Sequence, residues 1–307
     1  MKRITLTLLL GLLSAGFVLA QSPARSNLLV STDWLAKNLN HPKVVVIYVG
    51  RDHKDYHAGH VPKARFLALT DLVTTRDGKP NEMPSVEKLK MAFASLGVNN
   101  DSRVVIYSDN YNLYAARAFF TLDYLGLGGQ TALLDGGLDK WKAEKRPLTT
   151  EAPEPKAGNF TPRLNPNIVM VRDVVRDVSW VISKLDKPNY VLIDARPNDE
   201  YTGAKPGDGV KRGGHIPGAA NIFWLEKNLV SKENPVLRPA AELRKLYEAA
   251  GATKDKTVVS YCRTGVQASH TYFVAKYLGY EVAMYDGSFL EWSNTESTPV
   301  STGDKAK

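Results

Sequence analysis

The sequence contains a single cysteine, Cys262, and the residues around it have the types and spacing of a reactive site. Residues 257–261 are an apolar, β-branched run typical of a buried strand, and residues 266–278 have the pattern of a helix that stops at glycine. Gly265 lets the turn between them curl, so that backbone N–H groups point inward and form an anion-binding nest. We expect this setting, with Arg263 beside it, to hold the pKa of Cys262 below its ordinary value of about 8.5.

The alternative for Cys262 is a free cysteine packed at a strand end as a small hydrophobic residue. The order strand, Cys, Gly, helix favours a working thiol, because open α/β proteins bind ligands at the carboxyl ends of their strands. One cysteine excludes an intramolecular disulfide and a multi-cysteine zinc site. The six histidines do not cluster at ligand spacing, so we expect no metal and no cofactor.

The composition is that of a globular protein long enough for two domains. The chain has 307 residues, of which 43% are hydrophobic and 23% charged. The formal net charge is +8, and the basic residues are spread along the chain without a dense run. This mild excess fits small anionic substrates, and no nucleic-acid-binding motif is present, so we expect no nucleic-acid partner.

The first twenty residues have the layout of a secretory signal peptide. Lys2 and Arg3 precede an apolar stretch, and Val18 to Ala20 supply the small residues of a cleavage site. We expect a mature chain from about Gln21 that is periplasmic or secreted, has no stable membrane association and is a monomer. The alternative is an uncleaved N-terminal anchor, although the apolar run is marginal for a membrane span.

The remainder of the sequence consists of two similar halves. Five segments recur in the same order, namely 34–48 with 180–194, 60–64 with 215–219, 84–97 with 239–251, 103–107 with 257–261, and 134–141 with 285–292. Continuous apolar strands alternate with helices in both halves, which predicts an α/β fold of two tandem, doubly wound parallel-sheet domains. We place the first domain at residues 21–150, a proline-rich linker at 151–167 and the second domain at 168–307.

The segment Cys262 to Gln267 (CRTGVQ) resembles the active-site loop of the rhodanese sulfurtransferases. Residues 214–219 (GHIPGA) and 285–292 (YDGSFLEW) resemble the opening and closing motifs of that family, and the resemblance extends over essentially all of the mature chain. In the first half, Ser108 occupies the position of the cysteine and the loop glycine is absent. The resemblance is therefore to the tandem form of the family. In that form the first domain is catalytically silent, packs against the second domain and forms one wall of the active-site cleft.

The resemblance implies transfer of a sulfane sulfur from a small anionic donor to a thiophilic acceptor such as cyanide or a thiol. Cys262 would carry the sulfur as a persulfide, without needing a histidine as base. The substrate-binding residues that the resemblance implies are Arg196, Arg263, Thr264, Gly265, Val266 and Gln267. The alternative for Arg196 is a salt bridge to Asp199 or Glu200.

Donor choice depends on the two residues after the cysteine. Thiosulfate enzymes of the family carry Arg then Lys there, whereas mercaptopyruvate enzymes carry small uncharged residues. Arg263 and Thr264 match the thiosulfate pattern at the first position only, so we expect a thiosulfate sulfurtransferase with a weakened hold on its donor. The alternatives are a 3-mercaptopyruvate sulfurtransferase and a periplasmic persulfide carrier without turnover. A phosphatase on a related fold would need an arginine where Ala268 stands.

Several other residues have structural interpretations. We expect His215 to be a turn residue, His270 to be a bystander, and Asp286 and Trp292 to serve packing and turns. About ten residues between Tyr201 and His215 have no counterpart in the first half, and they include three cations, Lys205, Lys211 and Arg212. This insertion is either a simple surface loop or a mobile basic flap that attracts anionic donors.

Overall fold

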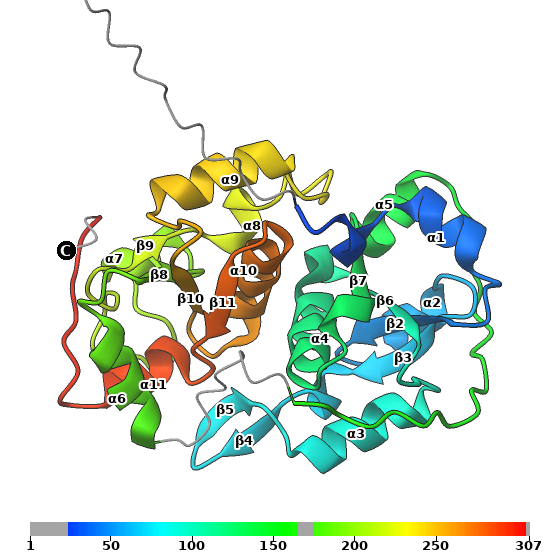
Figure 1. The fold of residues 1–307 in the computed structure, drawn as a ribbon, viewed down its shortest axis with the longest axis horizontal. Coiled ribbons are helices and arrows are strands. Elements are labelled where there is room, and N and C mark those ends of the chain that lie inside the picture. Colours follow the sequence, from blue (N-terminus) through cyan, green and yellow to red (C-terminus); the bar gives the residue numbers. More distant parts are fainter. Residues whose placement is uncertain (1–23, 165–174, 305–307) are drawn as a thin grey trace, which may run out of the picture.

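The computed structural model describes residues 24–164 and 175–304 and contains two α/β domains that lie side by side (Figure 1). The predicted signal peptide and part of the predicted linker lie outside the described residues. Residues 151–164 have no regular secondary structure and run along the first domain, where Gly158 N–H donates to the carbonyl of Ala94 and Phe160 is buried.

The first domain is built on a parallel sheet with the strand order β1-β7-β6-β2-β3. In that order its strands are Leu29–Val30, Thr131–Leu134, Arg103–Tyr107, Val44–Gly50 and Arg65–Ala68. Its helices are α1 (Thr32–Asn38), α2 (Lys54–Ala58), α3 (Val86–Ser95), α4 (Leu113–Tyr124) and α5 (Gly137–Ala143), with short 3₁₀ turns at Ser26–Leu28, Leu69–Asp71, Asn110–Asn112 and Gly128–Gln130. A two-stranded hairpin of β4 (Thr74–Arg76) and β5 (Lys79–Glu82) extends from this domain.

The second domain repeats the plan with the order β11-β10-β8-β9, again with all neighbours parallel. In that order its strands are Glu281–Met284, Thr257–Tyr261, Tyr190–Asp194 and Ala220–Asn221. Its helices are α6 (Val175–Lys184), α7 (Asn198–Thr202), α8 (Trp224–Lys227), α9 (Ala240–Ala249), α10 (Val266–Tyr277) and α11 (Ser288–Asn294). The α/β class and the two parallel-sheet domains predicted from the sequence are confirmed.

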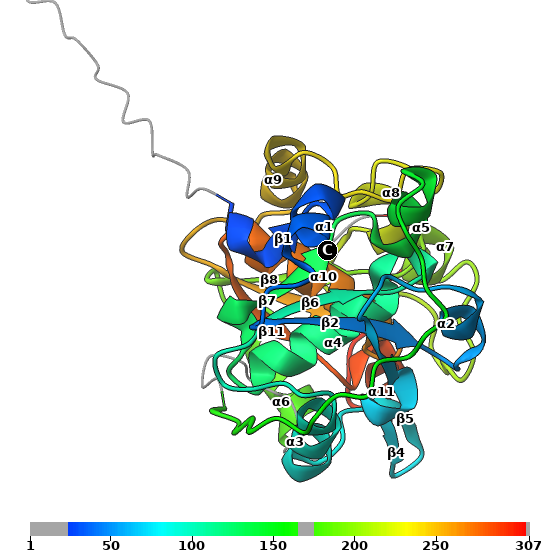
Figure 2. The same ribbon diagram turned by 90° about the vertical axis from the view of Figure 1, so that its right-hand side faces the viewer.

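Both sheets are covered on both faces, which explains why their strands are continuous apolar runs. In β2, Val46 and Tyr48 pack beneath α1, α2 and α5, while the alternate residues Val45 and Ile47 pack beneath α3 and α4. Figure 2 shows these layers above and below the first sheet. In the second domain α6 and α11 cover one face, and α8, α9 and α10 cover the other.

The duplication extends to individual hydrogen bonds. His60 stacks on Tyr56 with ring centroids 3.7 Å apart, and His215 stacks on Tyr201 at 3.8 Å. Each of these tyrosines donates its hydroxyl to a carbonyl at 2.7 Å, that of Ala64 in the first domain and that of Ala219 in the second. His215 and its counterpart therefore hold the turn after the first long strand of each domain, which is a structural role.

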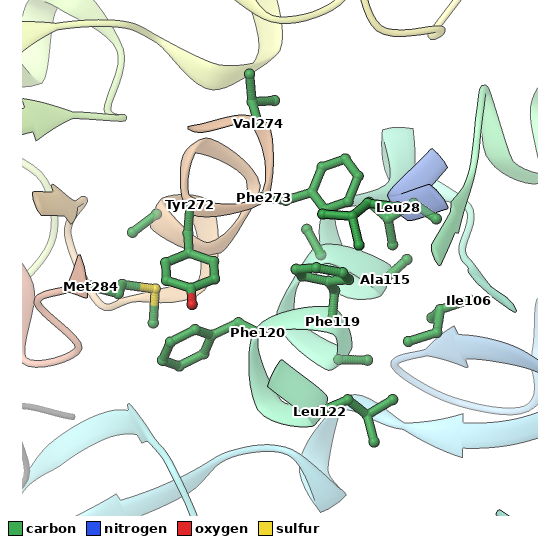
Figure 3. Close-up of a cluster of buried hydrophobic side chains, with 14 of the residues drawn as sticks. Leu28, Ile106, Ala115, Phe119, Phe120, Leu122, Tyr272, Phe273, Val274 and Met284 are labelled. Atoms are coloured by element: carbon green, nitrogen blue, oxygen red, sulfur yellow. The ribbon is translucent and has the colours of Figure 1, made fainter. Parts of the chain in front are cut away.

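The two domains pack through equivalent helices, α4 and α10. Phe119 meets Phe273 and Phe120 meets Tyr272 edge to face, with centroids 4.8 and 4.9 Å apart (Figure 3). These side chains belong to one hydrophobic core that continues from one domain into the other. Since α4 and α10 each begin just after a strand end, their packing brings the two preceding loops together.

A buried ion pair crosses the same interface. The Nη1 atom of Arg117 in α4 lies 2.5 Å from Oδ1 of Asp286, and both side chains are almost completely buried. Nη2 of Arg117 also donates to the carbonyl of Asn81 in the hairpin at 2.9 Å, and the N–H of Met83 donates to Asp286. The sequence predicts packing and turn roles for Asp286 without indicating a partner, and its main partner in the structure lies 169 residues away.

Candidate active site

Cys262 lies between the carboxyl end of β10 and the first turn of α10, as the sequence predicts. Gly265, the residue before the helix, has φ of +89°, and its N–H donates to Sγ of Cys262 at 3.1 Å. The left-handed conformation turns the chain back on itself and directs this N–H inward. The predicted curl of the loop around the thiol is present.

Close packing as well as backbone conformation demands glycine at position 265. A Cβ there would lie 2.5 Å from Oδ1 and 2.9 Å from the carbonyl oxygen of Asp286. The loop is also tied to the start of α11, because the N–H of Cys262 donates to Oγ of Ser288 and its carbonyl accepts from the N–H of Phe289 at 2.9 Å. Segments far along the chain therefore hold the cysteine loop in place.

The expected low pKa of Cys262 is wrong in direction. The side chain is 1% exposed, and its burial raises the pKa of the thiol because the charged thiolate loses hydration. The N–H groups of Ala268, Thr264 and Gly265 lower the pKa of Cys262 in part, and Asp194 raises it further. The nest is formed, but desolvation outweighs it.

We expect the reaction of Cys262 with a neutral alkylating agent such as iodoacetamide to become faster throughout the rise from pH 6 to pH 9. The thiolate is the reactive form, and the raised pKa leaves Cys262 mostly protonated at neutral pH. The rate should therefore not level off below the ordinary thiol value of about 8.5. Mass-resolved alkylation at a series of pH values checks this, and a plateau reached by pH 7 would contradict it.

A pocket of about 220 Å³ adjoins the cysteine and is formed by both domains. The second domain lines it with Cys262, Arg263, Thr264, Val266 and Gln267. The first domain lines it with Arg51, Leu69, Asn81, Asn110, Leu113 and Tyr114. Five of the residues expected at the site thus meet at this pocket, and Gly265 contributes its N–H to the thiol.

Arg196 lies elsewhere. It is 1% exposed, its Nη2 lies 2.6 Å from Oδ2 of Asp194, and the same nitrogen donates to the carbonyl of Gly214 at 2.7 Å. Its guanidinium lies over the ring of Phe289 at 4.0 Å. Its salt-bridge partner is therefore Asp194, two residues earlier, and not Asp199 or Glu200. Arg196 is not among the residues that line the pocket.

The 202–214 insertion is only partly consistent with a mobile basic flap. Arg212 donates to four carbonyls at the end of α11 and beyond, those of Trp292, Ser293, Thr295 and Thr298, and is therefore fixed in the fold. Lys205 and Lys211 are exposed. Gly207 lies against Arg263, since a Cβ at Gly207 would be 2.5 Å from Nη1 of that arginine.

In the first domain, the loop that corresponds to the cysteine loop follows β6 and is held by different contacts. Ser108 is buried, and the next turn contains three consecutive left-handed residues, Asn110, Tyr111 and Asn112, with φ of 50°, 58° and 61°. Oδ1 of Asn112 accepts the N–H of Ser108 and its Nδ2 donates to the carbonyl of Leu134. The asparagines tolerate this conformation better than most residues, and they place Asn110 in the wall of the pocket.

The residues that the sequence did not reveal all come from the first domain. Arg51 follows the carboxyl end of β2, and Asn81 at the hairpin donates to Oγ1 of Thr264 at 2.9 Å. The rule that ligands bind at the carboxyl ends of parallel strands, applied to the silent domain as well, would have pointed to Arg51. Nothing in the sequence pairs Asn81 with Thr264.

No histidine is among the described residues that line the cysteine pocket. His270 is fully buried on α10, where its Nδ1 contacts the amide of Asn228 at 3.3 Å, and burial lowers its pKa to about 3.

Within residues 24–164 and 175–304, no group of three or more His, Cys, Asp or Glu side chains is placed to hold a metal ion. No helix in the described part of the chain is long and apolar enough to cross a membrane.

Comparison with known proteins agrees with this architecture. The sequence pattern of the rhodanese-like domain matches residues 31–144 and 177–295, one match in each domain. The chain is 38% identical over 291 residues to the sulfur carrier protein TtuD of Thermus thermophilus, spanning 92% of this chain and 99% of that protein. It is 35% identical to the thiosulfate sulfurtransferase of Corynebacterium glutamicum, spanning 91% of this chain and 92% of the relative.

Solved structures show the same arrangement. SseA from Escherichia coli, described as a 3-mercaptopyruvate sulfotransferase, superposes with a TM-score of 0.72 at 27% identity over 85% of this chain and 98% of that one. Two parallel-sheet domains with one cysteine loop between them define a tandem sulfurtransferase. The chain belongs to the rhodanese family.

Proposed function

We propose that this protein is a thiosulfate sulfurtransferase that passes a sulfane sulfur to cyanide or a thiol through a persulfide on Cys262. The observation that carries the proposal is the position of Cys262 in a pocket with Arg263 and Thr264, with a backbone N–H directed at its sulfur. The full-length similarity to a protein named thiosulfate sulfurtransferase supports it.

The reaction has two halves and returns the enzyme to its starting state. The Cys262 thiolate attacks the outer sulfur of thiosulfate, a new S–S bond forms, and the bond from that sulfur to the sulfonate breaks. Sulfite leaves with the bonding electron pair, so that the cysteine carries one additional sulfur. The acceptor then attacks that terminal sulfur and the cysteine departs as a thiolate, which gives ping-pong kinetics. The N–H of Gly265 stabilises the negative charge on sulfur once the thiolate has formed.

Arg263 is the residue on which donor preference depends in this proposal. Its side chain is 35% exposed, and its nearest carboxylate, that of Glu200, is 3.9 Å away, so that much of its charge remains available to a substrate. Thiosulfate is a compact dianion, whereas mercaptopyruvate carries one carboxylate and a ketone.

We expect Arg263→Gly to raise the thiosulfate KM by roughly three- to tenfold, the effect of one partly exposed charge, and to change the mercaptopyruvate KM little. Steady-state thiocyanate formation with each donor measures this. Lys245→Gln, which removes an exposed charge from α9, serves as the control and should leave both values unchanged. An equal rise for both donors would show that Arg263 does not select between them.

The proposed activity is tested by comparing thiosulfate and mercaptopyruvate as donors with cyanide as acceptor. Sustained thiocyanate production with the higher kcat/KM for thiosulfate is the expected result. A higher kcat/KM for mercaptopyruvate would assign the protein to that donor instead. Loading of one sulfur without turnover would make it a carrier, the role named for the Thermus thermophilus relative.

We also propose that the protein is exported and acts in the periplasm or outside the cell. The basic start, the apolar stretch and the Val18 to Ala20 cleavage pattern support this. The mass of the protein recovered from a periplasmic fraction tests it, with a chain that begins at about Gln21 as the expected result. Recovery of the full-length chain from the cytoplasm alone would overturn it.

A further inference from the structure

Arg196 does not supply positive charge to the cysteine pocket, although an anionic donor would require it there. Arg196 is enclosed by Asp194, Gly214 and Phe289, and turning it into the pocket would leave the buried carboxylate of Asp194 without its partner. The arginine expected to bind an anionic donor is thus already paired with a carboxylate inside the second domain.

Two arginines and no carboxylate are among the described residues that line the pocket. Arg263 in the second domain has Glu200 at 3.9 Å, which offsets part of its charge. Arg51 in the first domain is exposed, and its guanidinium carbon lies 5.7 Å from the centre of the Tyr114 ring. Within the described residues no carboxylate lies within salt-bridge distance of Arg51, so its charge is the least compensated in the pocket.

The position of Arg51 follows from the fold. It comes directly after β2, whose carboxyl end faces the same interdomain space as the end of β10, because α4 and α10 pack against each other. The pocket therefore has cations from different domains, with the thiol of Cys262 among its lining atoms. A small oxyanion held there would interact with both domains at once.

We propose that Arg51 of the catalytically silent domain binds the anionic end of the substrate, a sulfonate or carboxylate group, and so acts as a specificity-determining residue for Cys262. The guanidinium offers paired N–H donors to such a group. This inference rests on the proposed function for the identity of the donor, but the anion site itself can be tested without sulfur transfer.

The experiment uses the single cysteine as a reporter. Because Cys262 is the one cysteine in the chain, the mass of an alkylated protein reports this site alone. Rates are measured with iodoacetate, an anion, and with iodoacetamide, its neutral counterpart, for the wild type, Arg51→Gln, Arg51→Lys and Lys54→Gln. Lys54 is exposed at the start of α2 and does not line the pocket, so it is the control for loss of a nearby charge.

We expect Arg51→Gln to lower the ratio of iodoacetate to iodoacetamide rates by roughly three- to tenfold. Arg51→Lys should retain most of the ratio and Lys54→Gln all of it, and the difference should shrink as salt is added. An unchanged ratio in Arg51→Gln, or an equal fall in Lys54→Gln, would overturn the proposal.

Thiosulfate loading separates this proposal from the proposed function. We expect Arg51→Gln to slow persulfide formation at low thiosulfate and to approach the wild-type rate at saturation, since it weakens binding and leaves the thiol intact. If thiosulfate does not load the wild type but the alkylation ratio still falls in Arg51→Gln, the anion site stands and the donor assignment fails. If loading is normal in Arg51→Gln at low thiosulfate, Arg51 does not bind the donor.

Discussion

Replacing Cys262 by serine should abolish sulfur transfer and leave the fold intact. Serine is nearly isosteric with cysteine, and the loop contacts that involve the backbone of Cys262 remain available to it. A hydroxyl is far less acidic than a thiol and cannot carry a sulfane sulfur in the same way. Mass spectrometry after incubation with thiosulfate should show one additional sulfur on the wild type and none on Cys262→Ser.

The duplicated fold provides a matched control for this experiment. Ser108 occupies the position in the first domain that corresponds to Cys262, and it is buried to the same degree. Ser108→Ala should therefore load sulfur at the wild-type rate, because the first domain takes no chemical part. Turnover in Cys262→Ser comparable to that of the wild type, with an unchanged thermal unfolding curve, would remove Cys262 from the mechanism.

Replacing Arg117 by leucine should destabilise the protein by about 3–5 kcal/mol, the cost of leaving one partner of a buried ion pair alone. The carboxylate of Asp286 would keep one N–H donor, that of Met83, and lose its counter-ion. The loss should also lower activity, because Asp286 packs directly against Gly265 in the cysteine loop. Thermal unfolding and persulfide loading measure the two effects.

Two further variants separate charge from volume at this interface. Asp286→Asn combined with Arg117→Leu removes the unpaired charge and should recover part of the lost stability. Lys43→Ala breaks the exposed pair with Asp101 and should leave the melting temperature almost unchanged, since both side chains are largely in solvent. A melting temperature for Arg117→Leu equal to that of Lys43→Ala would show that the buried pair does not hold the domains together.

The elements that the sequence predicted well are those governed by local chemistry. The helix expected at residues 266–278 is observed at Val266–Tyr277 with Leu278 as its C-cap, and Gly279 follows with φ of 91°. The recurring segment 84–97 forms a helix at Val86–Ser95 with Ser85 as its N-cap. Apolar periodicity, capping side chains and glycine conformations act within a few residues, and a sequence displays them directly.

The same local rules predicted the duplication and the place of the thiol. Two sets of strands and helices in one order led to two sheets of the same plan, and Cys262 lies at the strand end where the order strand, Cys, Gly, helix put it. Four of the residues that follow it, Arg263, Thr264, Val266 and Gln267, line the pocket because they belong to the same turn and to the start of α10.

Tertiary structure alone decided which arginines are paired within the fold and which keep a charge available to a ligand. Arg196 is neutralised by Asp194 and Arg212 binds carbonyls around the end of α11, whereas Arg51 retains an exposed charge at the pocket. It also decided that the pKa of Cys262 is raised, since burial outweighs the N–H donors of the loop. The reason is that burial and the choice of ion-pair partners depend on segments far apart in the sequence, which come together only when α4 packs on α10 and the hairpin reaches the cysteine loop.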